Sequence, residues 1–299
     1  MGSLFGGYLS QHNNVWLIDV NEEKISRINR EGVTINELDG KHKTFYPTAV
    51  KSGTALEDID LIIIFVKSMF SAKALSDNKL LIGSNTYVMS LQNGIGHEDT
   101  LLGFVPRERI IIGATQHNSS ITEEKHIHHG GGGKTNIGLL NGNSESLQSV
   151  ADSFIICGID TIISDNVKKI IWNKLFLNVS ASVLTAVLQV KLGFMLDNQF
   201  AGRLMKRLIF EAVGVANADG MNFDPDNVYT SVKEILENVR EGYTSIYADI
   251  QNGISTEVDT INGSIVRIAK QYGISVPNHE FIVDLVHAWE GKKKQELML

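Results

Sequence analysis

The chain has 299 residues, of which 43% are hydrophobic and 20% charged, and its formal net charge is -7. This length favours two domains, and the composition is typical of an ordinary globular protein. An acidic chain repels phosphate backbones, so nucleic acid is not expected as a partner. Cys157 is the single cysteine, which favours a reducing compartment, the cytoplasm. No run reaches the ~20 apolar residues that a membrane helix needs, so no membrane partner is expected.

The first half of the chain alternates short apolar runs with helical stretches. Four apolar runs are predicted to be strands: residues 14–19, 61–66, 87–91 and 110–115. A helix is predicted over residues 21–30, with Asn21 as its N-cap and Gly32 as its stop. The run LIIIFV at 61–66 is typical of a strand that is buried on both faces of a parallel sheet. Strands that alternate with helices predict βαβ units and a doubly wound sheet.

The character of the sequence changes after about Asp165, and from Val167 to Leu299 the periodicity is mostly helical. We therefore divide the chain into a dinucleotide-binding domain, residues 1–165, and a helical substrate and catalytic domain, residues 166–299. The predicted fold class is α/β, with a doubly wound Rossmann-type parallel sheet followed by an all-helical C-terminal domain.

The first residues, MGSLFGGYL, look like the start of the first helix of a dinucleotide-binding motif, which runs strand, GxGxxG, helix. Gly2 then takes the place of the last motif glycine. Asp19, at the end of the next predicted strand, takes the place of the acidic residue that holds the ribose of NAD. The first strand and two glycines of the motif are absent, so we expect the natural start to lie upstream of Met1. Alternatively, Gly2, Gly6 and Gly7 simply allow tight helix packing.

Two other patterns in the first half carry no expected function. His126, His128 and His129 lack the carboxylate or cysteine pattern that would complete a metal site, so a solvated hairpin is favoured and no metal is expected. The run GGGGKT at 130–135 is not a phosphate-binding loop, because His128 stands where that motif requires glycine.

Two further segments carry candidate chemistry. Asn93 lies in the run SLQNGIG at the carboxyl end of a predicted strand, where such sheets bind ligands, although Asn-Gly is also a common turn. Lys174, Asn178 and Ser182 are spaced four apart and are expected to share one face of a helix in apolar surroundings. A lysine at the mouth of an apolar cleft has a lowered pKa and can donate a proton. The alternative is a lysine that extends its ammonium into solvent at a domain boundary.

A third segment covers residues 243–250 and 255–263. Glu257 falls at the predicted start of a helix, where the helix dipole favours a carboxylate. That placement also explains Glu257 without any catalytic role.

Together these segments resemble the signature blocks of the ketopantoate reductase (2-dehydropantoate 2-reductase) family, in the same order and at similar separations. Asn93 matches the family's QNG turn, and residues 172–175 match its W-x-K-L helix. Residues 244–245 and 256–263 match its TS and TE-x-D-x-ING block, and Lys67 matches a lysine found near the cofactor. The resemblance covers nearly the whole chain except its beginning.

The resemblance implies that NADP(H) or NAD(H) delivers a hydride to the ketone of ketopantoate, giving D-pantoate for pantothenate biosynthesis. Lys174 is then the general acid, and Glu257 hydrogen-bonds the substrate hydroxyl and helps to hold Lys174. Asn178 and Ser245 bind the polar end of the substrate, and Asn93 lies between cofactor and substrate. We expect a small 2-oxo acid as the partner, and a monomer or a homodimer.

The sequence departs from the family at two positions. Ser182 stands where the family has a second asparagine, which enlarges the pocket and leaves the identity of the 2-oxo acid open. Asp19 stands near the place of an arginine that meets the 2′-phosphate of NADPH, and a carboxylate there favours NAD(H). The alternatives are an NAD-dependent dehydrogenase of branched D-2-hydroxy acids, a related hydroxy-acid or imine reductase, and a non-catalytic dinucleotide-binding relative.

Overall fold

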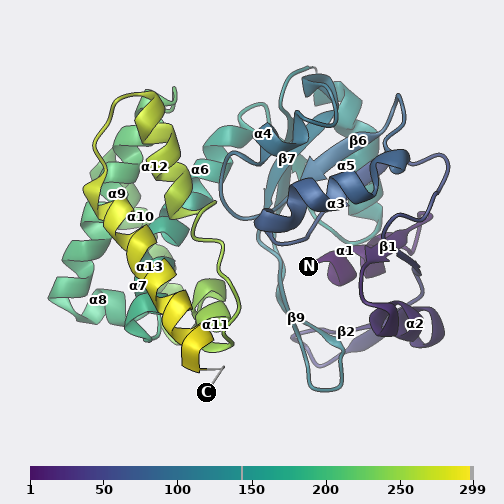
Figure 1. The fold of residues 1–299 in the computed structure, drawn as a ribbon, viewed down its shortest axis with the longest axis horizontal. Coiled ribbons are helices and arrows are strands. Elements are labelled where there is room, and N and C mark those ends of the chain that lie inside the picture. The colour runs from purple at the N-terminus through teal and green to yellow at the C-terminus, as the bar shows by residue number, and fades with distance from the viewer. Residues whose placement is uncertain (143, 297–299) are drawn as a thin grey trace. The chain divides into compact units, whose positions relative to one another are not determined.

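The computed structural model describes residues 1–142 and 144–296, and the chain packs as two compact units (Figure 1). The first unit contains Met1–Gln92 and His97–Ile170, and the second contains Asn93–Gly96 and the chain from Ile171 onward. Helix α6 (Val167–Leu177) runs across the border between them. The division at residue 165 stays a prediction.

The strands of the first unit form three sheets, most of whose neighbouring strands are parallel. The five-stranded sheet has the order β11 (Thr161–Ile163), β10 (Thr135–Leu139), β7 (Ile110–Thr115), β6 (Tyr87–Ser90), β5 (Leu61–Ile64). A two-stranded sheet pairs β1 (Trp16–Asp19) with β4 (Thr48–Lys51). The four-stranded sheet has the order β3 (His42–Phe45), β2 (Val33–Asn36), β9 (Ile127–Gly131), β8 (Asn118–Ile121). The predicted α/β class is confirmed, although the strands are shared among three sheets instead of one.

Helices α1 (Gly2–Leu9), α3 (Ser71–Asp77), α4 (His97–Leu101) and α5 (Gln148–Ile156) accompany these sheets. The core of the unit joins Phe5 of α1 and Phe154 of α5 to Met89 and Ile111 of the central strands, and all four are at most 1% exposed. Burying such side chains contributes about 1.5–3 kcal/mol each. This core therefore holds α1 and α5 against the central strands β6 and β7.

The predicted strands at 61–66, 87–91 and 110–115 correspond to β5, β6 and β7. β7 is buried along its whole length, as expected of a strand inside a sheet. The same expectation is wrong for β5, where only Ile64 is fully buried. Among the described residues β5 pairs with β6 alone, so it forms the edge of its sheet.

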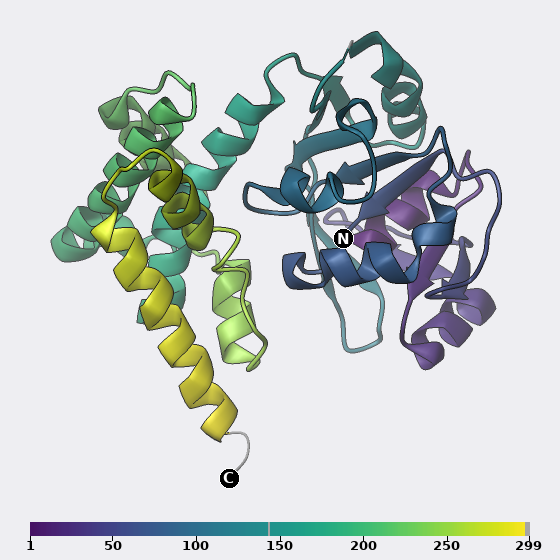
Figure 2. The same cartoon turned by 45° about the horizontal axis from the view of Figure 1, so that its top comes forward.

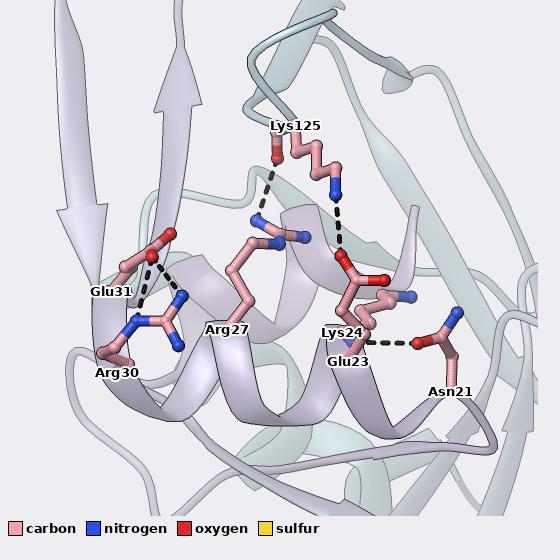
Figure 3. A network of polar contacts seen from close by, with 7 residues as sticks. All are labelled: Asn21, Glu23, Lys24, Arg27, Arg30, Glu31 and Lys125. Atoms are coloured by element: carbon pink, nitrogen blue, oxygen red, sulfur yellow. Dashed lines mark hydrogen bonds and ion pairs between the residues drawn. The ribbon is translucent and has the colours of Figure 1, made fainter.

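Helix α2 (Glu22–Glu31) follows the predicted bounds. Its N-cap Asn21 accepts a hydrogen bond from the Lys24 amide at 2.9 Å, and Gly32 ends the helix with a φ of 79°. Figure 3 shows how Lys125 joins α2 to the β8–β9 hairpin: its ammonium lies 2.9 Å from Glu23, and its carbonyl accepts from Arg27 at 3.2 Å. Because these contacts are exposed, they contribute little to the free energy of unfolding. They connect α2 to the hairpin.

The glycine-rich run begins at the end of β9, and β9 forms the predicted hairpin with the antiparallel strand β8. The expectation that its histidines are solvated is wrong for His129, which is 7% exposed. The His129 ring lies 2.7 Å from a Glu37 carboxylate oxygen, 3.0 Å from the Tyr8 hydroxyl and 2.9 Å from the His117 ring. Packing of the hairpin under α1 buries the ring, and these polar partners compensate for the lost water.

The described residues of the second unit form helices, turns and loops and no strand, which confirms the predicted all-helical C-terminal region. Its elements after α6 are η5 (Asn178–Ser182), α7 (Val183–Leu188), α8 (Phe194–Asp197), α9 (Gln199–Ala218), α10 (Pro225–Asn238), α11 (Ser245–Gln251), α12 (Asn262–Gln271) and α13 (Pro277–Glu296). Both views show α13, the yellow helix, running beside α12 (Figures 1 and 2).

Residues 167–188 form a helical segment at the centre of this unit. By length and composition alone the segment is able to cross a membrane, which differs from our expectation that no run is long enough. However, 61% of its most apolar window is buried inside the protein. Trp172, Phe176 and Val179 are at most 1% exposed and belong to the core of the unit. The segment therefore has the packing of a core helix.

Candidate functional site

Lys174 and Glu257 come together in the second unit. Lys174 is partly buried on α6. Burial lowers the pKa of Lys174 to about 8, and the nearby negative charge of Glu257 acts in the opposite direction. A lysine with this pKa can hold a proton at neutral pH and also release it. The pair therefore has the chemistry of a proton donor.

Glu257 does not lie at the start of a helix, so that expectation is wrong. Its carbonyl accepts hydrogen bonds from the amides of Thr260 at 3.1 Å and Ile261 at 3.0 Å, and α12 begins only at Asn262. The chain makes a separate turn at 257–261 before the helix. The helix-dipole explanation of Glu257 therefore does not apply, and its proximity to Lys174 is the specific feature of its position.

Asn178 and Ser182 lie one turn apart in η5, which is a π-helical segment between α6 and α7. The Ser182 hydroxyl donates to the Asn178 side-chain oxygen at 3.4 Å. This contact agrees with the expectation that the two residues share a helix face. The π-helical segment itself was not predicted, and such segments occur frequently at functional sites.

Ser245 is the first residue of α11, after the N-cap Thr244. The Thr244 hydroxyl accepts from the Tyr247 amide at 3.3 Å and donates to the Ser182 carbonyl at 3.3 Å. Thr244 therefore holds the start of α11 against η5. Ser245 is exposed next to this contact.

The Asn93–Gly96 turn packs with the second unit, although both of its flanking segments belong to the first. The Ile95 amide donates to the Thr260 carbonyl at 3.3 Å, and Arg267 donates to the Ile95 carbonyl at 3.1 Å. Gly94 has a φ of 103°, and a Cβ there would lie 2.2 Å from the Thr260 carbonyl oxygen. Only glycine allows this approach, which brings Asn93 next to the Glu257 turn.

The first unit holds the three residues expected to bind the cofactor, Gly2, Lys67 and Asp19. Gly2 opens α1, and a Cβ there would lie 3.4 Å from Phe65 Cβ, at an ordinary contact distance. Lys67 follows two residues after Phe65, at the start of η1 (Ser68–Phe70). Gly2 and Lys67 thus lie at the same end of the unit.

The alternative explanation of the α1 glycines, tight packing, applies to Gly6. A Cβ on Gly6 would lie 2.4 Å from Leu17 Cδ2 of β1, so this glycine is required by packing. Gly2 has no such requirement, since its Cβ would meet only Phe65 at contact distance. Gly2 is only partly buried, and backbone amides at a helix start are the groups that bind phosphate.

Asp19 ends β1 and forms an ion pair with Lys24 of α2. Its two carboxylate oxygens accept from the Lys24 ammonium at 2.5 Å and from the Asn21 amide at 3.0 Å. Burial acts to raise the pKa of Asp19, but the hydrogen bonds from Lys24 and Asn21 outweigh it, so the pKa lies below its ordinary value. Asp19 is therefore charged at neutral pH and able to accept ribose hydroxyls.

Two residues that contact the expected site residues or their loops were not predicted, although Gln92 belongs to the QNG turn. Lys24 reaches Asp19 from the first turn of α2, and no motif marks it. Gln92, just before Asn93, donates to the Val66 carbonyl at 2.6 Å and to the Ser71 hydroxyl at 2.9 Å, which fixes the loop that carries Lys67. Among residues 1–142 and 144–296, no group of three or more His, Cys, Asp and Glu side chains is arranged to hold a metal ion.

Known proteins resemble this chain over nearly all of its length. The sequence profile described as Ketopantoate reductase PanE/ApbA matches residues 1–142, and the profile described as Ketopantoate reductase PanE/ApbA C terminal matches residues 166–290. A Pyrococcus abyssi protein named 2-dehydropantoate 2-reductase is 32% identical and covers 98% of this chain and 97% of its own. A protein of the same name from Streptococcus pyogenes serotype M3 is 30% identical, with coverages of 97% and 95%.

A solved structure is also similar. The ternary structure of D-mandelate dehydrogenase with NADH and anilino(oxo)acetate superposes with a TM-score of 0.92 at 32% identity, and it covers 98% of this chain and 96% of its own.

Proposed function

Because the chain belongs to the ketopantoate reductase family, and is thus an oxidoreductase that acts on a CH–OH group, we propose that it reduces 2-dehydropantoate to D-pantoate with NAD(P)H. The partly buried position of Lys174 beside Glu257 carries this proposal, because burial there gives a proton donor whose pKa is about 8. Reduction of a ketone needs one hydride and one proton, and the chain has to provide the proton.

Bound NAD(P)H would supply the hydride for the new C–H bond at the ketone carbon. The carbonyl π electrons move onto the oxygen, and the Lys174 ammonium gives this oxygen a proton. The product is a 2-hydroxy acid, and neutral Lys174 regains a proton from solvent. Glu257 keeps the ammonium charged until the reaction and accepts a hydrogen bond from the new hydroxyl. Placing a cation beside a developing oxyanion in a largely buried site stabilises the transition state.

The remaining polar side chains of the second unit are proposed to hold the substrate. Asn178 and Ser245 bind its carboxylate and hydroxyl groups, and Ser182 lies against Asn178 at 3.4 Å. Asn93 reaches the substrate or the nicotinamide ribose from the turn at 93–96, which packs against Thr260. These residues orient the ketone so that Lys174 faces its oxygen.

The cofactor is proposed to bind the first unit through Gly2, Lys67 and Asp19. The start of α1 at Gly2 meets the pyrophosphate, Lys67 adds a positive charge nearby, and Asp19 accepts the hydroxyls of the adenosine ribose. The charged state of Asp19 supports NAD(H), whereas the neighbouring Lys24 offers a partner for the 2′-phosphate of NADP(H). We also propose a cytoplasmic location, which the free, buried thiol of Cys157 supports, and a monomer or homodimer stays our expectation.

A second candidate is an NAD-dependent dehydrogenase of branched D-2-hydroxy acids. Two observations favour it: Ser182 replaces a larger asparagine of the family, and Asp19 is charged. The similar D-mandelate dehydrogenase structure, which was solved with NADH, supports the same candidate. The two candidates share the chemistry of Lys174 and differ in the size of the 2-oxo acid side chain.

Side-by-side assays of NADH and NADPH oxidation test both candidates, with 2-dehydropantoate and phenylglyoxylate as the substrates. The reductase proposal expects the higher kcat/KM with 2-dehydropantoate, and the activity to disappear in Lys174→Ala. A higher kcat/KM with phenylglyoxylate would move the assignment to the second candidate. Cofactor binding without turnover of either substrate would indicate a non-catalytic relative.

Ser182→Asn is the sharper variant for substrate size. Asparagine fills space that serine leaves open, so kcat/KM for phenylglyoxylate is expected to fall about tenfold more than that for 2-dehydropantoate. Thr185→Ser is the matched control, because Thr185 lies on the same helical segment and donates to the Ser182 carbonyl at 3.0 Å. Equal losses for both substrates in Ser182→Asn would show that Ser182 does not set pocket size.

A further inference from the structure

The π-helical segment η5 receives hydrogen bonds from side chains on other elements. A π-turn shifts the helical hydrogen-bonding pattern, and carbonyl groups at such a shift need new donors. The Asn262 side-chain amide donates to the Val179 carbonyl at 2.7 Å, and the Thr244 hydroxyl donates to the Ser182 carbonyl at 3.3 Å. Asn262 is the buried member of this pair, at 0% exposure.

Asn262 is itself oriented by His279 of α13, which is also 0% exposed. His279 Nε2 lies 3.0 Å from the Leu208 carbonyl oxygen, which only accepts, so Nε2 carries the ring hydrogen. His279 Nδ1 is therefore an acceptor, and it lies 3.2 Å from Asn262 Nδ2. The Asn262 amide thus donates both of its hydrogens, one to His279 and one to Val179.

The remaining polar atom of Asn262, its side-chain oxygen, is buried and has no hydrogen-bond partner among the described residues. An apolar side chain would fill the same space without leaving an acceptor unsatisfied. An asparagine at this position is therefore hard to explain by packing alone, and its donation to Val179 is the distinctive contact.

The position of Asn262 links two parts of the site. On one side, Val179 follows Asn178 on the helical segment that also carries Lys174. On the other side, Asn262 follows directly after the turn at 257–261, in which the Glu257 carbonyl binds the amides of Thr260 and Ile261. The Asn262–Val179 hydrogen bond is thus a direct connection between the segment of Lys174 and the segment of Glu257.

We propose that Asn262 is a positioning residue, which, oriented by His279, sets the separation of Lys174 and Glu257 and the arrangement of Asn178 on the π-turn. Asn262 itself touches neither reacting group. The inference rests on the proposed function only for the catalytic meaning of Lys174, because the geometry that Asn262 controls is a property of the free protein.

The test measures the electrostatic coupling of Lys174 and Glu257 without substrate. Lysines are reductively ¹³C-methylated, which keeps their charge, and the Lys174 signal is assigned by its loss in Lys174→Arg. Its pKa is measured by NMR with and without Glu257→Gln in three backgrounds: wild type, Asn262→Ala and Ser264→Ala. Ser264 is the matched control, since it is equally buried on α12 but donates only to the Ile261 carbonyl, at 2.6 Å.

In the wild type, Glu257→Gln is expected to lower the pKa of Lys174, because a negative charge is removed. In Asn262→Ala this decrease is expected to shrink to less than half, and in Ser264→Ala to stay unchanged. The same decrease in all three backgrounds would overturn the proposal, and so would equal shrinkage in both variants. If Asn262→Ala does not fold, Asn262→Ser, which is too short to reach Val179, replaces it with the same expectations.

Activity gives a second, separate readout. Asn262→Ala is expected to lower kcat for 2-dehydropantoate by about 10²-fold, as misplaced catalytic groups do, with the KM for the cofactor unchanged. Ser264→Ala is expected to keep kcat within twofold. A wild-type protein that has no reductase activity would refute the proposed function, while the NMR coupling would still decide the role of Asn262.

Discussion

The carboxylate of Asp19 lies 2.5 Å from the ammonium of Lys24, at the end of β1. Both side chains are partly exposed, so the pair contributes little to stability. The pair matters for a bound cofactor, because the Asp19 carboxylate would repel the 2′-phosphate of NADPH and the neighbouring Lys24 ammonium would attract it. If Asp19 binds the adenosine ribose as proposed above, the choice between the two cofactors depends on both residues.

Asp19→Ala is expected to improve NADPH binding. Removal of the carboxylate takes away the repulsion and leaves Lys24 free to meet the 2′-phosphate, so the Kd for NADPH should fall roughly tenfold, or about 1.4 kcal/mol. The Kd for NADH should rise by a similar factor, because the ribose loses its acceptor. Fluorescence titration of the reduced cofactors measures both values.

Glu22→Ala is the control for Asp19→Ala. Glu22 is an exposed carboxylate three positions further along, and it pairs with Lys51 at 2.6 Å. Its removal changes the net charge equally but should leave the NADH to NADPH ratio unchanged. A shift of the same size in both variants would mean that net charge, and not the position of Asp19, governs the preference.

Proton donation by Lys174 is expected to give a characteristic pH profile. Because burial lowers the pKa of Lys174 to about 8, kcat/KM for ketone reduction should be constant below that pH and fall tenfold per unit above it. Oxidation of the hydroxy acid needs the neutral amine, so it should rise with pH and level off above the same value. Initial rates in both directions between about pH 6 and 10 test this.

Lys174→Ala should lower kcat by about 10²–10⁴-fold, the usual contribution of a general acid. Lys191→Ala is the control, because Lys191 is an exposed lysine that pairs with Glu241 at 2.6 Å and lies outside the proposed site. A profile in Lys174→Ala that still falls near pH 8 would assign the titration to another group.

Gly94→Ala is expected to displace the Asn93 turn. The new Cβ would collide with the Thr260 carbonyl oxygen at 2.2 Å, a backbone atom that cannot move alone, so kcat/KM should fall at least about tenfold. Gly220→Ala separates this effect from backbone strain. Gly220 has a φ of 86°, but a methyl group added there would meet no atom within 4 Å, so this variant should lose stability without losing kcat/KM.

His279 is expected to destabilise the second unit in acid. Burial lowers its pKa from the ordinary 6.5 to about 4, even though the Leu208 carbonyl and the nearby Glu211 carboxylate act in the opposite direction. Between these two values the unfolded state binds more protons than the folded state. The free energy of unfolding should therefore decrease as pH falls from 6.5 to 4, by up to about 3 kcal/mol.

Urea unfolding at pH 4.5 and pH 7, for the wild type and His279→Gln, measures this decrease, which the variant should lose. His287→Gln is a second comparison, because His287 is expected to affect the pH dependence of stability in the opposite direction. Burial acts to lower the pKa of His287, but its hydrogen bonds to Asp259 and Glu290 outweigh this and raise it. The contribution of His287 is therefore present in acid and lost as pH rises through its raised pKa. If the free energy of unfolding had the same pH dependence in the wild type, His279→Gln and His287→Gln, the assignment of that dependence to these two histidines would be contradicted.

Local patterns were sufficient to predict several elements of the fold. The bounds of α2 follow from Asn21 and Gly32, whose capping geometry depends only on neighbouring residues. β6 and β7 follow from continuous apolar runs, which signal a buried strand whatever it pairs with. The spacing of Asn178 and Ser182 predicted their contact for the same reason, because four residues make about one helical turn.

Tertiary structure alone decided the features that join distant segments. No local pattern shows that His129 is buried beneath α1, that β5 lies at a sheet edge, or that Glu257 stands in a turn beside Lys174. The Val179 carbonyl of η5 accepts a hydrogen bond from Asn262, which is far away in the chain, and the Asp19 carboxylate of β1 pairs with Lys24 of α2. Residue type and spacing determine local hydrogen bonding and burial tendency. The distances between charges and the partners of buried polar groups are fixed only when the segments pack together.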